Sequence, residues 1–430
     1  MSDTGQSSRR QFILGSAAIF GGAVLLPGCG GGGGGGNTIA PPQASLTRGV
    51  LGGGQQVPPV TSPGKGIAEI AINSAQTQMT VTLNTSGLTN VVMAHIHAGK
   101  VGVSGPIILD LFTGAQGTFP ATLTRTLTAN DLQPRPTAGI NTFQDAVNAV
   151  LAGNAYVNVH TAANPGGEIR GQVGQITTNG VLTGTTNAYG SVTGSLEPTL
   201  SSMTLTLQQV GLTNVTGAEI RIGREGDNGP VAFTLATADF NGQLSAVLNT
   251  ANLIPQTSVG VSTFADFVDA LLSGKTYVAV KTTGNANGAL RGQLLFTNYT
   301  ALLTANGLAP TVTNVAHGRA DVSLNLTKDV LAVNVATDTT LTNVTAIYMQ
   351  LGGPGGADAS FASLYNSTTD GVYSKGISKS LRSTDLTGAS GLSTIADVLA
   401  KIVAGSVIVT VINSSTVINS SLRLTGTLLG

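Results

Sequence analysis

The sequence contains no tryptophan, one cysteine (Cys29) and four histidines among its 430 residues. A single cysteine excludes an internal disulfide and a cysteine-based zinc site within the chain. Aromatic residues make up only 4% of the chain, so it has little to stack against sugar rings or nucleobases. The sequence also lacks paired carboxylates of the kind that cleave glycosidic bonds, which disfavours a sugar-degrading enzyme.

Charged side chains are scarce as well, with 20 basic and 20 acidic residues that cancel to a formal net charge of zero. Proteins that bind nucleic acid need a basic surface, so nucleic acid is excluded as a partner. No nucleophile elbow of the form Gly-x-Ser-x-Gly occurs, and we therefore predict a protein that is not an enzyme. Glycine is plentiful at 58 residues and hydrophobic residues make up 41%, enough for folded domains with real cores.

The first 29 residues have the features of an export signal. Arg9 and Arg10 precede a bulky apolar pair, as in twin-arginine signals. The apolar run from Phe12 to Leu26 is shorter than the ~20 residues that span a bilayer, which fits a cleaved signal. It ends in Leu26-Pro27-Gly28-Cys29, which resembles a lipoprotein box except that Pro27 replaces a small residue. A plain signal with a chance cysteine is the alternative.

If Cys29 is acylated, the mature protein is anchored to a membrane through lipid, in the periplasm or at the cell surface. Seven consecutive glycines, residues 30–36, follow the cysteine. Glycine runs are flexible and bury nothing, so we expect residues 30–45 to be a tether.

Several landmarks occur three times in the same order, which indicates an internal repeat. Gly87-Leu-Thr-Asn-Val91 recurs at 211–215 and, with threonine first, at 340–344. A Thr-x-x-Asp motif begins at Thr142, Thr263 and Thr394, and in each case a glycine follows 11 residues after the threonine. Arg170-Gly-Gln172 recurs at 291–293 and loosely at 423–426. The predicted domains are residues 46–176, 177–298 and 299–430, the third being the most diverged.

Most segments within a repeat alternate apolar and polar residues, as half-buried strands do. Met79-Thr-Val-Thr-Leu83 and Tyr156-Val-Asn-Val-His160 are examples, each with counterparts in the other repeats. The segment from Thr142 to Gly153 instead has helical periodicity, with a capping threonine and a terminating glycine. We predict an all-β protein of three tandem antiparallel β-sandwich or β-barrel domains, each with one short helix.

Three motifs of the first repeat resemble the chordin (CHRD) domain family: His95-Ile-His97-Ala-Gly99, Tyr156-Val-Asn-Val-His160 and Pro165-Gly-Gly-Glu-Ile-Arg-Gly-Gln172. Gln55-Gln56-Val57-Pro58-Pro59-Val60 is similar to the opening motif of that family. The resemblance covers nearly all of the first repeat; the second lacks the histidines, and the third shares mainly the order of elements. It implies extracellular β-sandwich modules whose biochemical role is mostly undefined.

The histidines of the first repeat are candidate metal ligands. His95 and His97 are two apart and share one face of a predicted strand, while His160 ends another strand and Glu168 follows it. Such a set suits zinc or copper; the alternative is a metal-free cluster of hydrogen-bonded side chains. The aligned positions of the second repeat hold Glu219, Arg221 and Lys281, and those of the third hold Tyr348, Gln350 and Ile412.

The exchange of three histidines for one acid and two bases indicates that these positions converge in space without a metal being required by the fold. The sequence thus predicts a non-catalytic binding, adhesion or structural module at the cell envelope, with an unknown envelope or extracellular ligand and no obligatory cofactor. The alternative is a zinc- or copper-binding protein, with or without redox activity, that works through the first domain.

Overall fold

The computed structural model describes residues 44–184, 188–304, 317–324, 329–337, 343–352, 360–370, 373, 376–413 and 417–421. The chain separates into two units, residues 1–41 and 42–430, and the described residues all lie in the second. The expected export signal with Arg9 and Arg10, the acylated Cys29 and nearly all of the tether fall outside the described residues. No helix among those described is long and apolar enough to cross a membrane.

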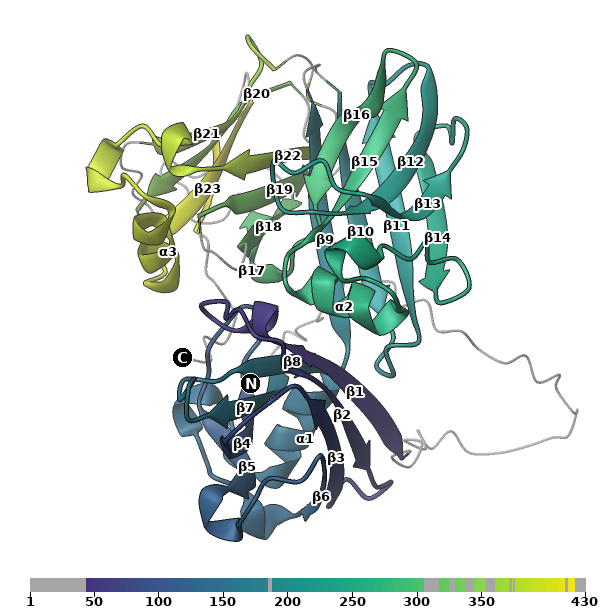
Figure 1. The fold of residues 1–430 in the computed structure, drawn as a ribbon. Helices are drawn as coiled ribbons and strands as arrows, with labels where there is room; N and C mark the ends of the chain where they lie inside the picture. Colours follow the sequence, from purple (N-terminus) through teal and green to yellow (C-terminus); the bar gives the residue numbers. More distant parts are fainter. Residues whose placement is uncertain are drawn as a thin grey trace, which may run out of the picture. The chain divides into compact units, whose positions relative to one another are not determined.

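The first domain is an eight-stranded antiparallel sheet that curls into a barrel-like shape (Figure 1). The strand order is β5-β4-β7-β8-β1-β2-β3-β6. The strands are β1 (Ser45–Gly52), β2 (Lys65–Ile72), β3 (Met79–Ser86), β4 (Val91–Ala98), β5 (Ile107–Thr113), β6 (Thr122–Leu127), β7 (Ala155–Thr161) and β8 (Ile169–Val173). This order places β4 and β7, which carry the histidines, side by side.

The second domain repeats this arrangement strand for strand, in the order β13-β12-β15-β16-β9-β10-β11-β14. Its strands are β9 (Ile176–Gly184), β10 (Tyr189–Leu196), β11 (Ser202–Val210), β12 (Val215–Ile222), β13 (Val231–Ala236), β14 (Gln243–Asn249), β15 (Thr276–Thr282) and β16 (Asn285–Gln293). The pair β12–β15 therefore occupies the place of β4–β7. Two tandem domains of one topology follow from these orders.

The third region forms two four-stranded sheets, ordered β17-β18-β19-β22 and β21-β20-β23-β24. Their strands are β17 (Thr297–Thr304), β18 (His317–Leu324), β19 (Leu331–Thr337), β20 (Val344–Leu351), β21 (Ser360–Asn366), β22 (Gly376–Leu381), β23 (Val407–Asn413) and β24 (Val417–Ser421). Apolar residues of both sheets, Val333 and Val409 among them, share one core.

Helices α1 (Phe143–Leu151), α2 (Phe264–Leu272) and α3 (Ile395–Val403) begin directly after Thr142, Thr263 and Thr394, as predicted. Each threonine hydroxyl accepts a hydrogen bond from a backbone N–H three residues on, and the aspartate there accepts one from the threonine N–H. This reciprocal capping box stabilises a helix start. Short 3-10 helices lie in the connections: η1 (Gly53–Gln55), η2 (Gly114–Gln116), η3 (Ala129–Asp131), η4 (Pro136–Ala138), η5 (Thr257–Val259), η6 (Ser383–Asp385) and η7 (Ala389–Gly391).

The core of the first domain lies on one face of β4, where Ala94, Ile96 and Ala98 are fully buried. The opposite face of the same strand is buried too, although it carries His95 and His97. All seven residues of β7 are buried, so the expectation of a half-buried strand is wrong there. The loops that contain Gly105 and Pro165 cover this second face, and backbone oxygens of these two residues contact histidine rings. The result is a buried polar layer over β4 and β7.

Candidate metal centre

The three histidines of the first domain lie together on this covered face. His95 and His97 project from β4, and His160 comes from β7, where it pairs with Met93 of β4. One ring nitrogen from each histidine lies within 4.8 Å of the others. The residues are 3%, 7% and 7% exposed, so little solvent reaches the rings.

Two backbone carbonyls fix the orientation and tautomer of two of the rings. His97 Nδ1 lies 2.8 Å from Gly105 O, and His160 Nδ1 lies 2.9 Å from Pro165 O. A carbonyl oxygen only accepts hydrogen bonds, so each Nδ1 carries the proton and donates it. Each Nε2 then carries a lone pair, the form in which imidazole accepts hydrogen bonds or binds metals.

His95 completes the group. Its Nδ1 lies 3.3 Å from His160 Nε2, and because that Nε2 is an acceptor, His95 donates the hydrogen bond. On the other side of the ring, Nε2 lies 3.7 Å from Oδ1 of Asp110 on β5. For zinc, with nitrogen ligands at 2.0–2.1 Å in a tetrahedron, the ligand atoms stand about 3.4 Å apart. The nitrogens of His95 and His160 already have that spacing. An ion between them would replace their hydrogen bond, with the proton of His95 carried instead on Nε2, which faces Asp110.

The lone pair of His97 is the unusual feature of the cluster. Its Nε2 is buried and has no hydrogen-bond partner in the described part of the chain. Buried polar atoms in folded proteins are nearly always satisfied, so an exception needs an explanation. An ion held between the rings would give this atom a partner, provided that the rings close in by up to about 1.4 Å to reach the tetrahedral spacing.

Burial keeps the rings uncharged. It lowers the pKa of His97 from 6.5 to about 4, an effect to which the neighbouring histidines and Arg170 add and which the Gly105 carbonyl opposes. Burial also lowers the pKa values of His95 and His160. All three imidazoles are therefore neutral at neutral pH and have a lone pair to offer.

The second domain uses the same three positions for an ion triad. Glu219 and Arg221 lie on β12 and Lys281 on β15, with Lys281 in the register position that His160 has in the first domain. The Glu219 carboxylate accepts from Arg221 Nε at 2.9 Å and from the Lys281 ammonium. Burial raises the pKa of Glu219, but the hydrogen bonds and charges of Lys281 and Arg221 more than offset this, and the pKa is lowered. The three positions converge in both domains.

Comparison with known families matches both domains. The model of the CHRD domain fits residues 47–173 and 176–294, more than half of the chain. The chain belongs to the CHRD family. No curated protein and no solved structure gives a significant match.

In the first CHRD domain, the side chains of Arg170, Tyr156 and His97 form a clasp that holds the loop between β4 and β5. The Arg170 guanidinium lies 3.5 Å from the centre of the Tyr156 ring, and the same ring stacks on His97 with centroids 4.8 Å apart. Tyr156 Oη accepts the N–H of Gly105 at 3.0 Å, and the carbonyl of that glycine accepts from His97. Since a Cβ at Gly105 would lie 1.5 Å from Ala98 O, only glycine fits there.

The second CHRD domain repeats this clasp. Arg291 lies 3.5 Å over the ring of Tyr277, Tyr277 Oη accepts the N–H of Gly229 at 3.0 Å, and the Gly229 carbonyl accepts from Arg221 at 3.1 Å. The repeated Arg-Gly-Gln motif was the sequence signal for this element. Neither the tyrosine as its partner nor Asp110 beside His95 was found from the sequence.

Glu168 does not join the histidines, contrary to its expected place as a fourth ligand. Among the described residues, the group that forms consists of His95, His97 and His160. Both carboxylate oxygens of Glu168 are engaged elsewhere: one accepts from Ser62 Oγ and the other from Thr161 Oγ1, each at 2.6 Å. The side chain closes the loop after β7 instead of facing the rings.

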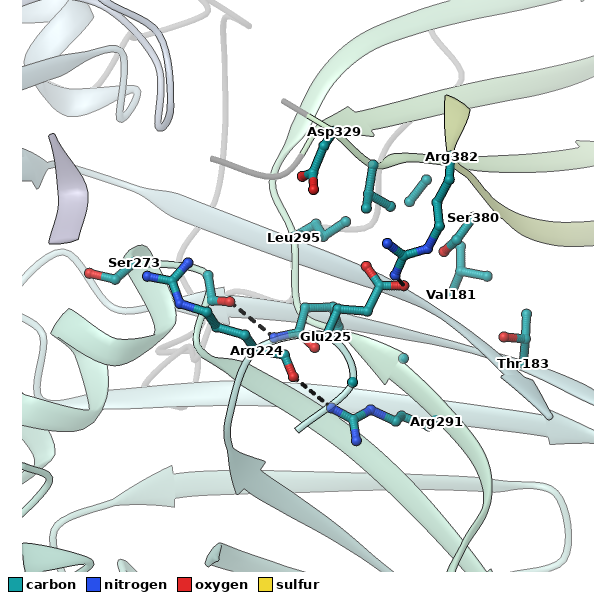
Figure 2. Close-up of a pocket in the computed structure, with 16 residues that line it drawn as sticks. Val181, Thr183, Arg224, Glu225, Ser273, Arg291, Leu295, Asp329, Ser380 and Arg382 are labelled. Atoms are coloured by element: carbon teal, nitrogen blue, oxygen red, sulfur yellow. Dashed lines mark hydrogen bonds and ion pairs between the residues drawn. The ribbon is translucent and has the colours of Figure 1, made fainter. Parts of the chain in front are cut away.

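A cavity of about 580 Å³ lies elsewhere in the chain, lined by three arginines and a glutamate among others (Figure 2). Two of its three guanidinium groups have partners: Arg382 pairs with Glu225, and Arg291 donates to the backbone oxygens of Asp227 and Arg224. The histidine cluster is the stronger candidate for function, because one of its buried ring nitrogens has no hydrogen-bond partner among the described residues.

Proposed function

We propose that this protein binds a zinc or copper ion at the cell envelope, through His95, His97 and His160 of its first CHRD domain. The observation that carries the proposal is the buried Nε2 of His97, which has no hydrogen-bond partner among the described residues and belongs to a ring beside two other imidazoles. The neutral state of the rings supports it, since a protonated imidazole is no ligand. The chain's own groups would hold the ligands in place: Gly105 and Pro165 orient two rings, and Asp110 faces the third.

The placement at the envelope rests on the sequence. The twin-arginine pattern at Arg9 and Arg10 and the lipobox-like Cys29 support export and lipid anchoring. Replacing Cys29 by serine should release the protein from the membrane fraction. Unchanged membrane partition would contradict the anchor and leave the metal site untouched.

The second CHRD domain and the third region are proposed to be non-catalytic binding or spacer modules. For the third region, a diverged CHRD-like origin is supported by its strand register: Tyr348 and Gln350 pair with Thr410 and Ile408, as His95 and His97 pair with Asn158 and Tyr156. Its three aligned positions include no histidine, so a single metal ion per chain is expected.

The test uses the full chain, stripped with a chelator and titrated with zinc or copper(II). One equivalent of metal should bind and raise the melting temperature, because a ligand that binds only the native state at 100 times its Kd stabilises it by about 2.7 kcal/mol. The triple variant His95→Ala, His97→Ala, His160→Ala should lose both effects. His317→Ala, which removes the fourth histidine, is the matched control and should retain both. Equal metal binding by the triple variant would overturn the proposal.

A further inference from the structure

The charges around the histidine cluster point to the kind of ion it takes. We infer that the site is built for a monovalent ion, copper(I), in preference to zinc(II). This rests on the proposed function, since it presupposes that the cluster binds metal. Two features carry it: the number of ligands available and the sum of the fixed charges.

The described residues bring three imidazoles together, and no fourth histidine, cysteine or carboxylate among them joins the group, Asp110 included. Glu168 is held by Ser62 and Thr161, and the amide oxygen of Asn158, the neighbour of His95 in the register, accepts from Gln56 at 2.6 Å. Zinc in proteins is almost always four-coordinate, and a three-ligand zinc site keeps an open position for water or substrate. With its histidines at most 7% exposed, this cluster has little room for an added water. Copper(I) is stable with three ligands.

The fixed charges do not compensate a divalent ion. Among the described residues, the ionised side chains that act on the histidines are the Asp110 carboxylate and the Arg170 guanidinium, and these cancel. Asp110 is also 43% exposed in its side chain, so water screens part of its attraction. Arg170 is buried and stacks on the Tyr156 ring, and that ring in turn stacks on His97. The positive charge of Arg170 therefore lies near His97.

Neutral imidazoles add no charge of their own, in contrast to thiolate or carboxylate ligands. A zinc ion would therefore leave two uncompensated positive charges in a buried site, and copper(I) would leave one. The cost of burying an ion rises with the square of its charge in a continuum description, so the divalent ion is penalised about four times as heavily.

Competition titrations on the chelator-stripped full chain test the inference. Zinc(II) is titrated against a zinc-chelating dye, and copper(I) is titrated without oxygen against a copper(I)-selective dye. The affinity for copper(I) should exceed that for zinc(II) by on the order of 100-fold or more. Equal affinities, or tighter zinc binding, would overturn the inference and leave the proposed function standing. Failure to bind either ion would overturn both.

A variant that removes one charge near the site tests the inference independently. Asp110→Asn removes the carboxylate near His95 while keeping its shape. Because Coulomb energy is proportional to the charge of the ion, the loss in log affinity should be about twice as large for zinc(II) as for copper(I). Glu69→Gln removes an exposed acid that pairs with Arg48 and should change neither affinity. Equal losses for both ions in Asp110→Asn would contradict the charge argument.

Discussion

The two CHRD domains have the same strand order, the same helix cap and the same tyrosine–arginine clasp. They differ at three equivalent positions, which hold charged side chains in the second domain and neutral imidazoles in the first. In the second domain, Glu219 pairs with Arg221 and Lys281, and the group satisfies itself. In the first, three neutral histidines leave one buried nitrogen without a partner in the part of the chain that the structure describes. The difference teaches that the fold needs neither charges nor metal at this place, and that, of these two sets of side chains, the set in the first domain has a nitrogen left to bind an ion.

The two sites also differ in how much stability a bound ion could add. An unsatisfied buried polar atom costs about 1–3 kcal/mol, so the first domain has stability to gain from an ion at this place. The second domain has no comparable deficit at its triad, because each charged group there has a partner. Four predictions test how far this contrast extends.

The largest effect is expected from Glu219→Ala in the second domain. It leaves Arg221 and Lys281 with like charges in a site where they are 18% and 25% exposed. Breaking a buried ion pair from one side costs about 3–5 kcal/mol, and the partial exposure places this variant near the lower limit. Hydrogen exchange measured by mass spectrometry on peptides of β12 and β15 would report the loss.

The matched control is Glu69→Ala, which breaks the exposed pair with Arg48 and should cost about 0–1 kcal/mol. Equal losses in the two variants would mean that the triad is no more than a surface pair, and the contrast between the domains would weaken.

The second largest effect is expected from acidification, which should destabilise the first domain but not the second. The lowered pKa values of the cluster mean that the unfolded chain binds protons below pH 6.5 that the folded first domain does not. Stability therefore falls as pH falls, and His97 alone, with its pKa at about 4, accounts for a loss of about 2 kcal/mol between pH 6.5 and 5.

The second domain should not respond in that range. The folded pKa of Glu219 is lowered from 4.5, so its contribution is fully present above 4.5 and is lost only below it. Hydrogen exchange, corrected for the intrinsic pH dependence of the rates, should show deprotection of β4 and β7 at pH 5 with β12 and β15 unchanged. A parallel loss in both domains would refute this assignment.

Local signals in the sequence predicted much of this structure. Each helix follows from a threonine, an aspartate three residues later and a terminal glycine, all within 12 residues, because capping is a property of neighbouring residues. Alignment of the repeats also brought the three site positions together, since a register shared by two domains places equivalent residues at equivalent points of the sheet.

Contacts between residues far apart in the sequence determine the features that the sequence did not predict. Glu168 follows His160 closely along the chain, but its partners are Thr161 and the distant Ser62, a choice made by loop packing. Asp110 reaches His95 only because β5 pairs with β4. The full burial of β7 arises from the loops that cover its second face, and strand periodicity carries no information about such a cover.

The clasp offers a smaller and more selective test. Tyr156→Phe and Tyr277→Phe each remove the hydroxyl that accepts a glycine N–H, at a cost of about 1–3 kcal/mol for the donor left behind. Only Tyr156→Phe should also weaken metal binding, by about 10-fold, because the loop it holds carries the Gly105 carbonyl that orients His97. Equal metal affinity of the two variants would show that the clasp has no positioning role.

The smallest effect should be the same in every part of the chain. Thr142→Ala, Thr263→Ala and Thr394→Ala each remove the hydroxyl that caps a helix, and each should cost about 1 kcal/mol. The three caps have the same hydrogen bonds, with the backbone N–H of the aspartate at 3.2, 3.1 and 3.1 Å from the threonine hydroxyl. Exchange in peptides of α1, α2 and α3 measures each loss separately. Thr→Ser, which retains the hydroxyl, should restore most of the protection. Because these caps lie outside the histidine cluster, metal affinity should stay unchanged in all three variants. A cost that differed several-fold among the helices would show that the domains diverge in their framework as well as at the three site positions.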